Sequence, residues 1–429
     1  IADNQLIYEM GKEIGRECKR IGININFAPD VDVNNNPNNP VINDRSFGED
    51  KYKVALKGLE YADGLQDEGV LACAKHFPGH GDVNTDSHLD LPIINKPAAT
   101  FDTLEFYPFK ILLNNKVGGT MVAHLNVPAL DTAAGSVSSI SHRIATDWLR
   151  DSLGFTGLTF SDALNMKGVS KYYKPGTVDS MAFMAGCDIL VFSEDASKGI
   201  AKIQMAVDSG VIPMGELEAR VKKVLAYKYN LGLNKPQQVN LANLREDLNN
   251  TKALLLQQKL YEQAMTIAAN KNNLLPFKNW NYKKVASLSI GNNGMSAFQN
   301  NINNFEEMDF FNQSQEHNDK LFAAILDTLA TYDLVIVDLH DMVRAAARNY
   351  NVTDETVKFL NALSAKTKVV LCVFGNPYSL KYFDSIPCML EAYEDNSVTN
   401  LTAANALFGA EKISGNLPFT ASPLFPARS

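Results

Sequence analysis

The sequence predicts a parallel α/β protein, with an incomplete (β/α)8 TIM-type barrel followed by a second α/β domain. Short apolar runs alternate with helical segments along the chain, which is typical of parallel βα units. Ionisable residues such as His76, His124 and Asp162 directly follow three of these runs, and a TIM barrel places its active site at that end of its strands. The 429 residues are enough for two or three domains of ordinary size.

The first half of the chain opens on a predicted helix that Asn4 can cap and that Gly22 is placed to end. A β-rich run follows at residues 23–27, and a second helix is expected at about residues 50–67. Further strands are expected at residues 70–75, 119–123, 158–160 and 188–192. Helices are expected at residues 103–113, 144–153, 181–185 and 216–229.

The predicted strands are too few for a closed barrel. We count about five, whereas a TIM barrel has eight, and the chain opens on a helix. We therefore expect roughly three βα units, on the order of 100 residues, to precede Ile1 in the intact protein. The alternative is that weak strands escape the pattern or that the barrel is incomplete. The C-terminal end leaves room for a further domain downstream.

The second half of the chain begins after a stretch rich in Asn and Gln that contains Pro236, which is typical of a linker. Strands are then expected at residues 285–290, 334–338, 369–374 and 389–393. Helices are expected at residues 320–331, 355–364 and 398–408. This pattern indicates an open, mostly parallel sheet with helices on its faces. We therefore divide the chain into a partial catalytic barrel (1–232), a linker (233–254) and an α/β sandwich domain (255–429).

Composition excludes several classes of function. The net charge of −8, without a basic patch, argues against nucleic acid as a partner. No apolar run is long enough to span a membrane, and no glycine-rich nucleotide-binding motif accompanies the predicted strands. The five cysteines are scattered and odd in number, so they do not indicate a disulfide framework. We expect no cofactor.

The densest chemical motif is KHFPGHGDVNTDSH at residues 75–88. Its proline and glycines prevent a helix, so its histidines are expected on an ordered loop over the mouth of the barrel. One interpretation is a metal site, whose ligands would be His76, His80, His88, Asp82 and Asp86. A second interpretation is that these residues only stabilise turns.

A third interpretation of this motif is a proton-transfer pair formed by Asp86 and His88. A carboxylate two residues away can accept a hydrogen bond from one imidazole nitrogen and stabilise the imidazolium. The other nitrogen can then give a proton to a leaving group and take one from water. A second motif, FTGLTFSDALNM at residues 155–166, is an apolar strand that ends in Asp162. Alone, that aspartate is equally compatible with a helix N-cap and with catalysis.

Together these motifs resemble glycoside hydrolase family 3, in its β-N-acetylglucosaminidase branch. The histidine-loop signature is KHFPGHG followed by DSH, and the upstream block is NFAP at residues 26–29 with Asp32-Val33 and then DRSFG at residues 44–48. FSDAL at residues 160–164 with Met166 resembles the nucleophile block. GNP at 375–377, YED at 393–395 and GNLP at 415–418 resemble landmarks of the C-terminal α/β sandwich.

The resemblance implies a retaining hydrolase that removes terminal β-linked N-acetylglucosamine through a covalent glycosyl-aspartate. Asp162 resembles the nucleophile, His88 the general acid/base and Asp86 its orienting partner. The residues that resemble those holding the sugar are Arg45, Lys75 and His76. An aspartate that the family takes from an early barrel strand has no matching motif here.

These residues follow different strands, so we expect Arg45, Lys75, His76 and Asp162 to line one pocket. His88 is expected on a mobile loop that keeps it near Asp86. Further residues that can line the pocket are His124, Asp32 and Met166, although His124 can also fill the rim and Asp32 can brace the loop to Arg45. The polar residues Asp338, His340, Asp341 and Arg344 follow a strand of the second domain, where we favour a sheet edge over a site.

Several alternatives remain open. Neutral imidazole repels an incoming anion less than a carboxylate would, so a phosphorolytic enzyme of the same family is one alternative. The others are a β-glucosidase of the family, a metal-dependent hydrolase and a non-catalytic sugar-binding protein. The expected partner is a small oligosaccharide, either a peptidoglycan fragment or a chitin-type chain. We expect a periplasmic or secreted protein, with the cytoplasm as the alternative.

Overall fold

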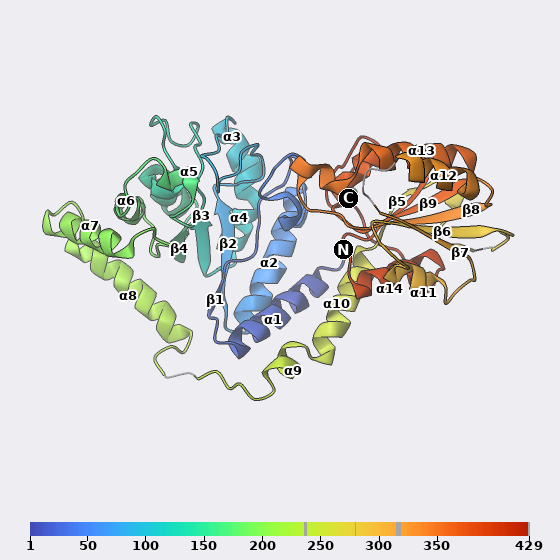
Figure 1. Ribbon diagram of the computed structural model, residues 1–429. Helices are drawn as coiled ribbons and strands as arrows, with labels where there is room; N and C mark the ends of the chain where they lie inside the picture. The colour runs from blue at the N-terminus through green and yellow to red at the C-terminus, as the bar shows by residue number, and fades with distance from the viewer. Residues whose placement is uncertain (236–237, 279, 315–318, 428–429) are drawn as a thin grey trace. The chain divides into compact units, whose positions relative to one another are not determined.

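The computed structural model describes residues 1–235, 238–278, 280–314 and 319–427. The chain divides into two compact units, Asn4–Asn250 and Thr251–Ser429, the second joined by Ile1–Asp3. Figure 1 shows both units, with the first coloured from blue to green and the second from yellow to red. Among the described residues, no helix is long and apolar enough to cross a membrane. Pro236, in the predicted linker, lies outside the described residues.

The first unit is built from short strands that alternate with helices. Its strands are β1 (Ile25–Asn26), β2 (Leu71–Phe77), β3 (Gly119–Val122) and β4 (Leu158–Ser161). Its α-helices are α1 (Asn4–Arg20), α2 (Lys51–Asp67), α3 (Ala98–Thr100), α4 (Phe106–Asn114), α5 (Lys167–Ser170), α6 (Thr177–Ala185), α7 (Ala196–Asp208), α8 (Met214–Asn230) and α9 (Leu244–Leu248). Two π-helical segments lie at Phe101–Glu105 and Arg143–Ser152, and 3-10 turns lie at Asn43–Arg45 and Ser138–Ile140.

The four strands form one parallel sheet in which each strand pairs with the next along the chain, in the order β1-β2-β3-β4 (Figure 1). This confirms the predicted alternation of parallel strands and helices. The strand predicted at residues 188–192 is reduced to one parallel bridge between Ile189 and Phe160. The backbone of Phe192 adopts a positive φ of 52°, which ends extended structure there. Whether the sheet is part of a barrel stays a prediction.

One face of this sheet carries a cluster of apolar side chains. A cluster of buried residues from β2, β3 and β4 packs against partly buried residues of α8 and of the segment around Ile189. Its buried members are Leu71, Cys73, Met121, Leu158 and Phe160.

Helix α2 is capped at its N-terminus by Asp50, whose carboxylate accepts hydrogen bonds from the backbone N–H groups of Tyr52 and Lys53. The sequence analysis missed α7 altogether.

The second unit is a six-stranded sheet between two layers of helices. Its strands are β5 (Thr266–Asn270), β6 (Val285–Ile290), β7 (Asp309–Gln313), β8 (Leu334–Leu339), β9 (Lys368–Val373) and β10 (Cys388–Glu391). Its α-helices are α10 (Thr251–Ala264), α11 (Ala297–Ile302), α12 (Asp319–Leu329), α13 (Asp354–Lys366) and α14 (Ser397–Leu407). Three 3-10 segments lie at Lys271–Asn273, Ala346–Asn351 and Pro377–Phe383.

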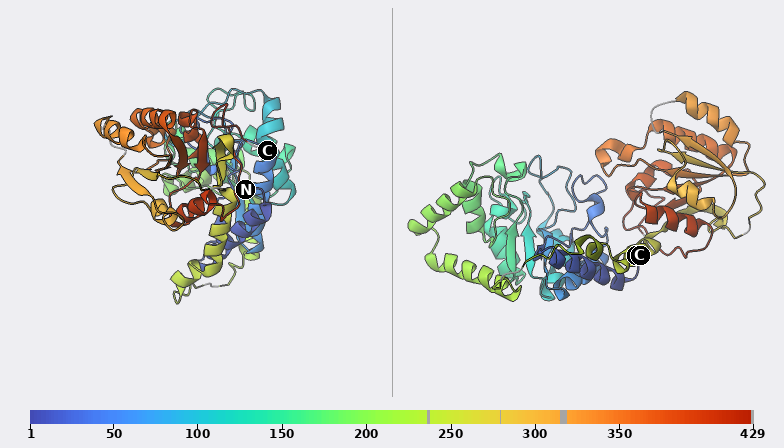
Figure 2. Two further views of the ribbon diagram at one scale, coloured as in Figure 1. Left: turned by 90° about the vertical axis from the view of Figure 1, so that its right-hand side faces the viewer. Right: turned by 60° about the horizontal axis from the view of Figure 1, so that its bottom comes forward.

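The strand order is β5-β10-β9-β8-β6-β7, and every neighbouring pair is parallel except β5 with β10. Alternate residues along β8 and β9 belong to two separate apolar cores. One core contains residues of α12 and α13, and the other contains residues of α11 and α14. Figure 1 and the further views in Figure 2 show these two helix layers on opposite faces of the sheet.

The four predicted strands of this unit are present as β6, β8, β9 and β10, whereas β5 and β7 were missed. Both missed strands lie at the edges of the sheet, where half-exposed and small residues replace the apolar runs of the central strands.

Candidate active site

A bulge at the end of β2 directs two consecutive side chains toward one cavity. In the pairing of β2 with β3, Ala74 lies opposite Thr120 and Phe77 lies opposite Val122, so the β2 side holds one extra residue. Regular alternation would place neighbouring side chains on opposite faces of the sheet, and a bulge re-aims them. Lys75 and His76 therefore both line the cavity.

The cavity lies at the C-terminal ends of the strands and has a volume of about 200 Å³. Side chains from distant parts of the first unit meet there. The sequence-predicted residues that line it are Arg45, Lys75, His76, His88, Asp162 and Met166. Asp32 and His124 are not among its lining residues, because both are fully buried behind it.

Asp32 is a buried acceptor that fixes the geometry of His76. Its Oδ2 lies 2.7 Å from His76 Nδ1, and the backbone N–H groups of His76 and His80 also donate to its carboxylate. Nη2 of Arg45 lies 3.4 Å from His76 Nε2, and a guanidinium can only donate. His76 Nε2 is therefore the acceptor on the cavity side, and Nδ1 carries the hydrogen that points to Asp32.

The environment keeps His76 neutral. Burial lowers the pKa of His76 to about 4, although the nearby Asp30 and Asp162 carboxyl groups act in the opposite direction. Asp30 was not predicted as part of the site, yet its Oδ2 lies 3.6 Å from Arg45 Nη2. Burial and the neighbouring Asp32 raise the pKa of Asp30 to about 7. The Asp30 carboxyl is therefore protonated more readily than that of an ordinary aspartate.

Asp162 follows β4, and its backbone N–H continues the ladder by donating to the carbonyl of Val122 at 2.9 Å. Its Oδ1 accepts a hydrogen bond from the backbone N–H of Ala163 at 2.8 Å. Burial alone would raise the pKa of Asp162, but the imidazoles of His124 and His76 and the Ala163 N–H outweigh it and lower the pKa below its usual value. Asp162 is therefore a partly exposed carboxylate at neutral pH.

His88 lies on the loop above the cavity with its side chain 59% exposed. Its Nδ1 and its backbone nitrogen both lie 2.8 Å from Asp86 Oδ1. Nε2 is consequently the nitrogen that is free to exchange a proton with a molecule in the cavity. The structure thus brings His88 and Asp86 together as the sequence analysis expected.

His124 lies buried behind the cavity wall, next to the turn that follows Asp162. Its Nδ1 lies 2.6 Å from Ser139 Oγ, and its Nε2 lies 2.9 Å from the carbonyl oxygen of Ala163, the residue after Asp162. Burial lowers the pKa of His124. His124 therefore braces the turn that carries Asp162 and does not fill the rim.

Three polar residues in or beside the cavity were missed as site residues: Asp30, His80 and Ser87. His80 and Ser87 line the cavity and lie within the histidine-loop motif, but the sequence analysis considered His80 only as a metal ligand. Asp30 follows a predicted strand, which is the same signal that singled out Asp162. Strand-end position could therefore have found Asp30, whereas nothing local distinguished Ser87.

The predicted metal ligands do not gather at one point. Asp82 forms an ion pair with Lys96 at 2.8 Å, and Asp86 pairs with His88. Within the described residues, the ligand atoms that do come within 4.8 Å of one another are those of Asp30, Asp32 and His76. Of these three residues, Asp32 already accepts hydrogen bonds from two backbone N–H groups and from His76 Nδ1, so its carboxylate is engaged within the protein.

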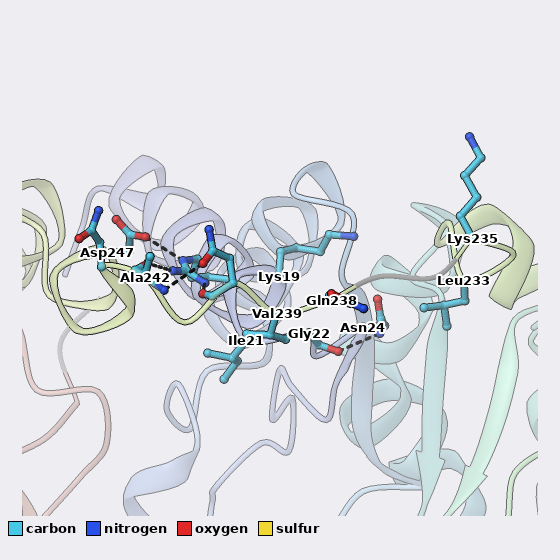
Figure 3. A pocket seen from close by; sticks show the side chains of 13 residues that line it. Lys19, Ile21, Gly22, Asn24, Leu233, Lys235, Gln238, Val239, Ala242 and Asp247 are labelled. Carbon is cyan, nitrogen blue, oxygen red and sulfur yellow. Dashed lines mark hydrogen bonds and ion pairs between the residues drawn. The ribbon is translucent and has the colours of Figure 1, made fainter.

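Two other polar regions carry no comparable chemistry. A groove of about 790 Å³ lies in the first unit (Figure 3). It is lined by residues at the C-terminal end of α1 and just after it, and by residues within 233–235 and 238–247. Its Arg20 donates to the carbonyls of Asn240 and Ala242 and to Asp247. In the second unit, the buried His340 lies 2.9 Å from Asp338, a member of the same predicted cluster, and 2.9 Å from Asp395, which was not predicted there.

Comparisons with known proteins agree with this geometry. Beta-hexosaminidase A of Pseudoalteromonas piscicida is 33% identical over 290 residues, which are 63% of this chain and 48% of that protein. A beta-N-acetylglucosaminidase/beta-glucosidase of Cellulomonas fimi is 26% identical over 430 residues, which are 95% of this chain and 76% of that protein. The chain thus spans about half the length of the first of these relatives.

The fold also matches that of a solved structure. The glycoside hydrolase family 3 beta-N-acetylglucosaminidase of Paenibacillus sp. str. FPU-7 matches with a TM-score of 0.80 at 27% identity, over 97% of this chain and 80% of that chain. The sequence profile of the glycosyl hydrolase family 3 N terminal domain matches residues 1–227. These matches confirm the family that the motifs indicated: the chain belongs to glycosyl hydrolase family 3.

Proposed function

We propose that the full-length protein is a retaining β-N-acetylhexosaminidase that removes terminal β-linked N-acetylglucosamine from an oligosaccharide. The observation that carries the proposal is one cavity lined by an ionised aspartate, Asp162, and by an Asp86-bound imidazole, His88. The names of the relatives support the choice of an N-acetylated sugar.

In the first step, a carboxylate oxygen of Asp162 attacks the anomeric carbon, and the bond from that carbon to the leaving oxygen breaks. The leaving oxygen takes the proton from Nε2 of His88, which Asp86 stabilises in its imidazolium form. The products are a glycosyl ester on Asp162 and neutral His88. The lowered pKa of Asp162 supports this role, because a nucleophile must be ionised at working pH.

In the second step, neutral His88 takes a proton from water while the water oxygen attacks the anomeric carbon. The ester bond breaks, and Asp162 leaves as a carboxylate. Two inversions give net retention at the anomeric carbon, and His88 regains the proton that it gave in the first step. An exposed loop suits this double use, since His88 must reach the leaving oxygen and then water.

Arg45, Lys75 and His76 are proposed to hold the sugar before the cleaved bond. They lie on the cavity wall, where the cationic groups of Arg45 and Lys75 can donate hydrogen bonds to sugar hydroxyl groups and His76 holds Arg45 in place through Nε2. The nearby Asp30 partly balances the charge of Arg45.

We further propose that the sheet β1–β4 is an arc of a TIM-type barrel, with residues 1–232 as the catalytic domain, 233–254 as a linker and 255–429 as an α/β sandwich domain. The sequential parallel order of the strands supports the barrel, as does the Ile189–Phe160 bridge that extends the sheet beyond β4.

The test is an assay of the full-length protein with 4-nitrophenyl β-N-acetylglucosaminide, followed by proton NMR of the first sugar released. We expect the β-anomer to form first and then to mutarotate. An α-anomer at first release would contradict the retaining mechanism. Comparison of a disaccharide from chitin with a peptidoglycan disaccharide, by kcat/KM, then identifies the preferred substrate.

The same assay separates the alternatives. A product of N-acetylglucosamine 1-phosphate in phosphate buffer would identify a phosphorolytic enzyme, and faster turnover of the β-glucoside would identify a β-glucosidase. Loss of activity in a chelator would favour a metal-dependent hydrolase, whereas binding without turnover would identify a sugar-binding protein. Fractionation of cells that make the tagged full-length protein tests the expected periplasmic or secreted location against the cytoplasm.

A further inference from the structure

The loop that carries His88 is closed at its base by two buried side chains. His80 Nε2 lies 3.1 Å from Ser87 Oγ, across seven positions of sequence. His80 is 1% exposed and Ser87 is 2% exposed, whereas the next residue, His88, has a side chain that is 59% exposed. His88 is therefore exposed itself but directly follows a buried anchor, Ser87.

His80 is held firmly at its backbone. Its N–H donates to Asp32 Oδ1 at 2.6 Å, and its carbonyl oxygen accepts from Asn39 Nδ2 at 2.8 Å. Asp32 is fully buried and also fixes His76 at the end of β2. The contact of the His80 imidazole with Ser87 therefore connects the loop to the end of β2, where Asp32 holds His76.

The loop has further attachments near its end, where Asp90 forms an ion pair with Lys171 and accepts a hydrogen bond from the Tyr172 hydroxyl at 2.6 Å. The carbonyl oxygen of Ser87 accepts from the backbone N–H of Gly168 at 3.2 Å, and that of His88 accepts from Lys167 at the longer distance of 3.4 Å. These two contacts involve backbone atoms alone, and those of Asp90 lie on the C-terminal side of His88. On the N-terminal side of His88, the side-chain bond from Ser87 to the buried His80 is the contact that ties the loop to the end of β2.

We propose that His80 and Ser87 form a latch that positions His88 over Asp162 for proton transfer. The inference rests on the proposed acid/base role of His88. His80 and Ser87 are positioning residues: they act by fixing the loop, and neither exchanges a proton with the substrate. A misplaced general acid slows the cleavage of poor leaving groups, because only those need the proton in the transition state.

The test compares Ser87→Ala with Thr85→Ala in the full-length protein. Thr85 is an exposed residue of the same loop, so its variant controls for the loss of a hydroxyl group there. We expect Ser87→Ala to lower kcat/KM about tenfold for phenyl β-N-acetylglucosaminide and less than about twofold for the 2,4-dinitrophenyl substrate. Thr85→Ala should change neither. Equal losses on both substrates, or no difference between the two variants, would overturn the latch.

Substitutions of His80 test the other side of the contact. His80→Gln can place an amide group near the position of Nε2, whereas His80→Leu fills the space without a hydrogen bond. We expect His80→Leu to reproduce the leaving-group dependence of Ser87→Ala and His80→Gln to restore part of the loss. A His80→Leu variant with the leaving-group dependence of the wild type contradicts the latch.

A double variant separates this inference from the proposed function. If His88 is the acid/base, His88→Ala alone shows the leaving-group dependence, and adding Ser87→Ala then changes kcat/KM less than twofold. A His88→Ala variant with equal losses on both substrates rejects the acid/base role and the latch with it. A further tenfold loss from Ser87→Ala in the His88→Ala background rejects the latch alone.

Discussion

His88 and Asp86 are joined twice through one oxygen, since Asp86 Oδ1 lies 2.8 Å from both the Nδ1 and the backbone nitrogen of His88. A second exposed pair of the same kind, His142 with Asp147 at 3.0 Å, lies outside the cavity lining. The two pairs share their chemistry and differ in their location, which makes the second a matched control for the first.

We expect His88→Ala to slow substrates with poor leaving groups by at least about 100-fold and activated phenols much less, because a general acid matters most for a basic leaving oxygen. Asp86→Ala should show the same pattern more weakly, since it removes only the partner that orients the imidazole. His142→Ala should leave kcat/KM unchanged across the series. A flat dependence for His88→Ala would remove it from the acid/base role.

Asp162→Ala and Asp162→Asn are expected to abolish turnover of aryl β-N-acetylglucosaminides in the full-length protein. Loss of the nucleophile removes the covalent route and should cost several kcal/mol of transition-state stabilisation. The measurement is kcat/KM, with circular dichroism to verify the fold. Retention of more than about a tenth of the wild-type rate, a loss of only ~1.4 kcal/mol, would show that the assignment is wrong.

Asp30→Asn is expected to change how thermal stability depends on pH. Burial and Asp32 raise the folded-state pKa of Asp30 from 3.8 to about 7. The folded state therefore binds more protons than the unfolded state between these values, and Asp30 removes stability as the pH rises through that window. The amide has no such titration, so Tm of the variant minus Tm of the wild type should increase from about pH 4 to about pH 7 and then level off. Parallel Tm curves would contradict the raised pKa.

Gly81→Ala tests the packing of the histidine loop. A Cβ at Gly81 would lie 1.9 Å from the backbone oxygen of Val33, so the loop or the segment after β1 must move. We expect a loss of at least about 2 kcal/mol in the free energy of unfolding, together with a loss of activity. Gly215→Ala is the control, because a Cβ there meets nothing within 4 Å and α8 gains a better helix former. Equal stability of the two variants would show that the loop adapts freely.

The sequence determined the architecture on the scale of single elements. Apolar runs of strand length alternate with helical patterns, and this local periodicity correctly predicted β2, β3, β4, β6 and β8–β10. It failed at the sheet edges, where β5 and β7 lack long apolar runs, and at residues 188–192, where the backbone turns at Phe192. The strand-end position of Asp162 and the sequence motifs also identified six of the thirteen residues that line the cavity.

The tertiary structure alone decided how those residues are supported. Strict alternation would place Lys75 and His76 on opposite faces, whereas the irregular pairing of β2 with β3 at this point brings both to the cavity. Asp32 reaches His76 across 44 positions of sequence, and it reaches His80 across 48. Such contacts depend on how separate strands and loops pack in three dimensions. Local periodicity reports only which face of its own element a side chain occupies, so it could find the reacting groups but not the buried network that holds them.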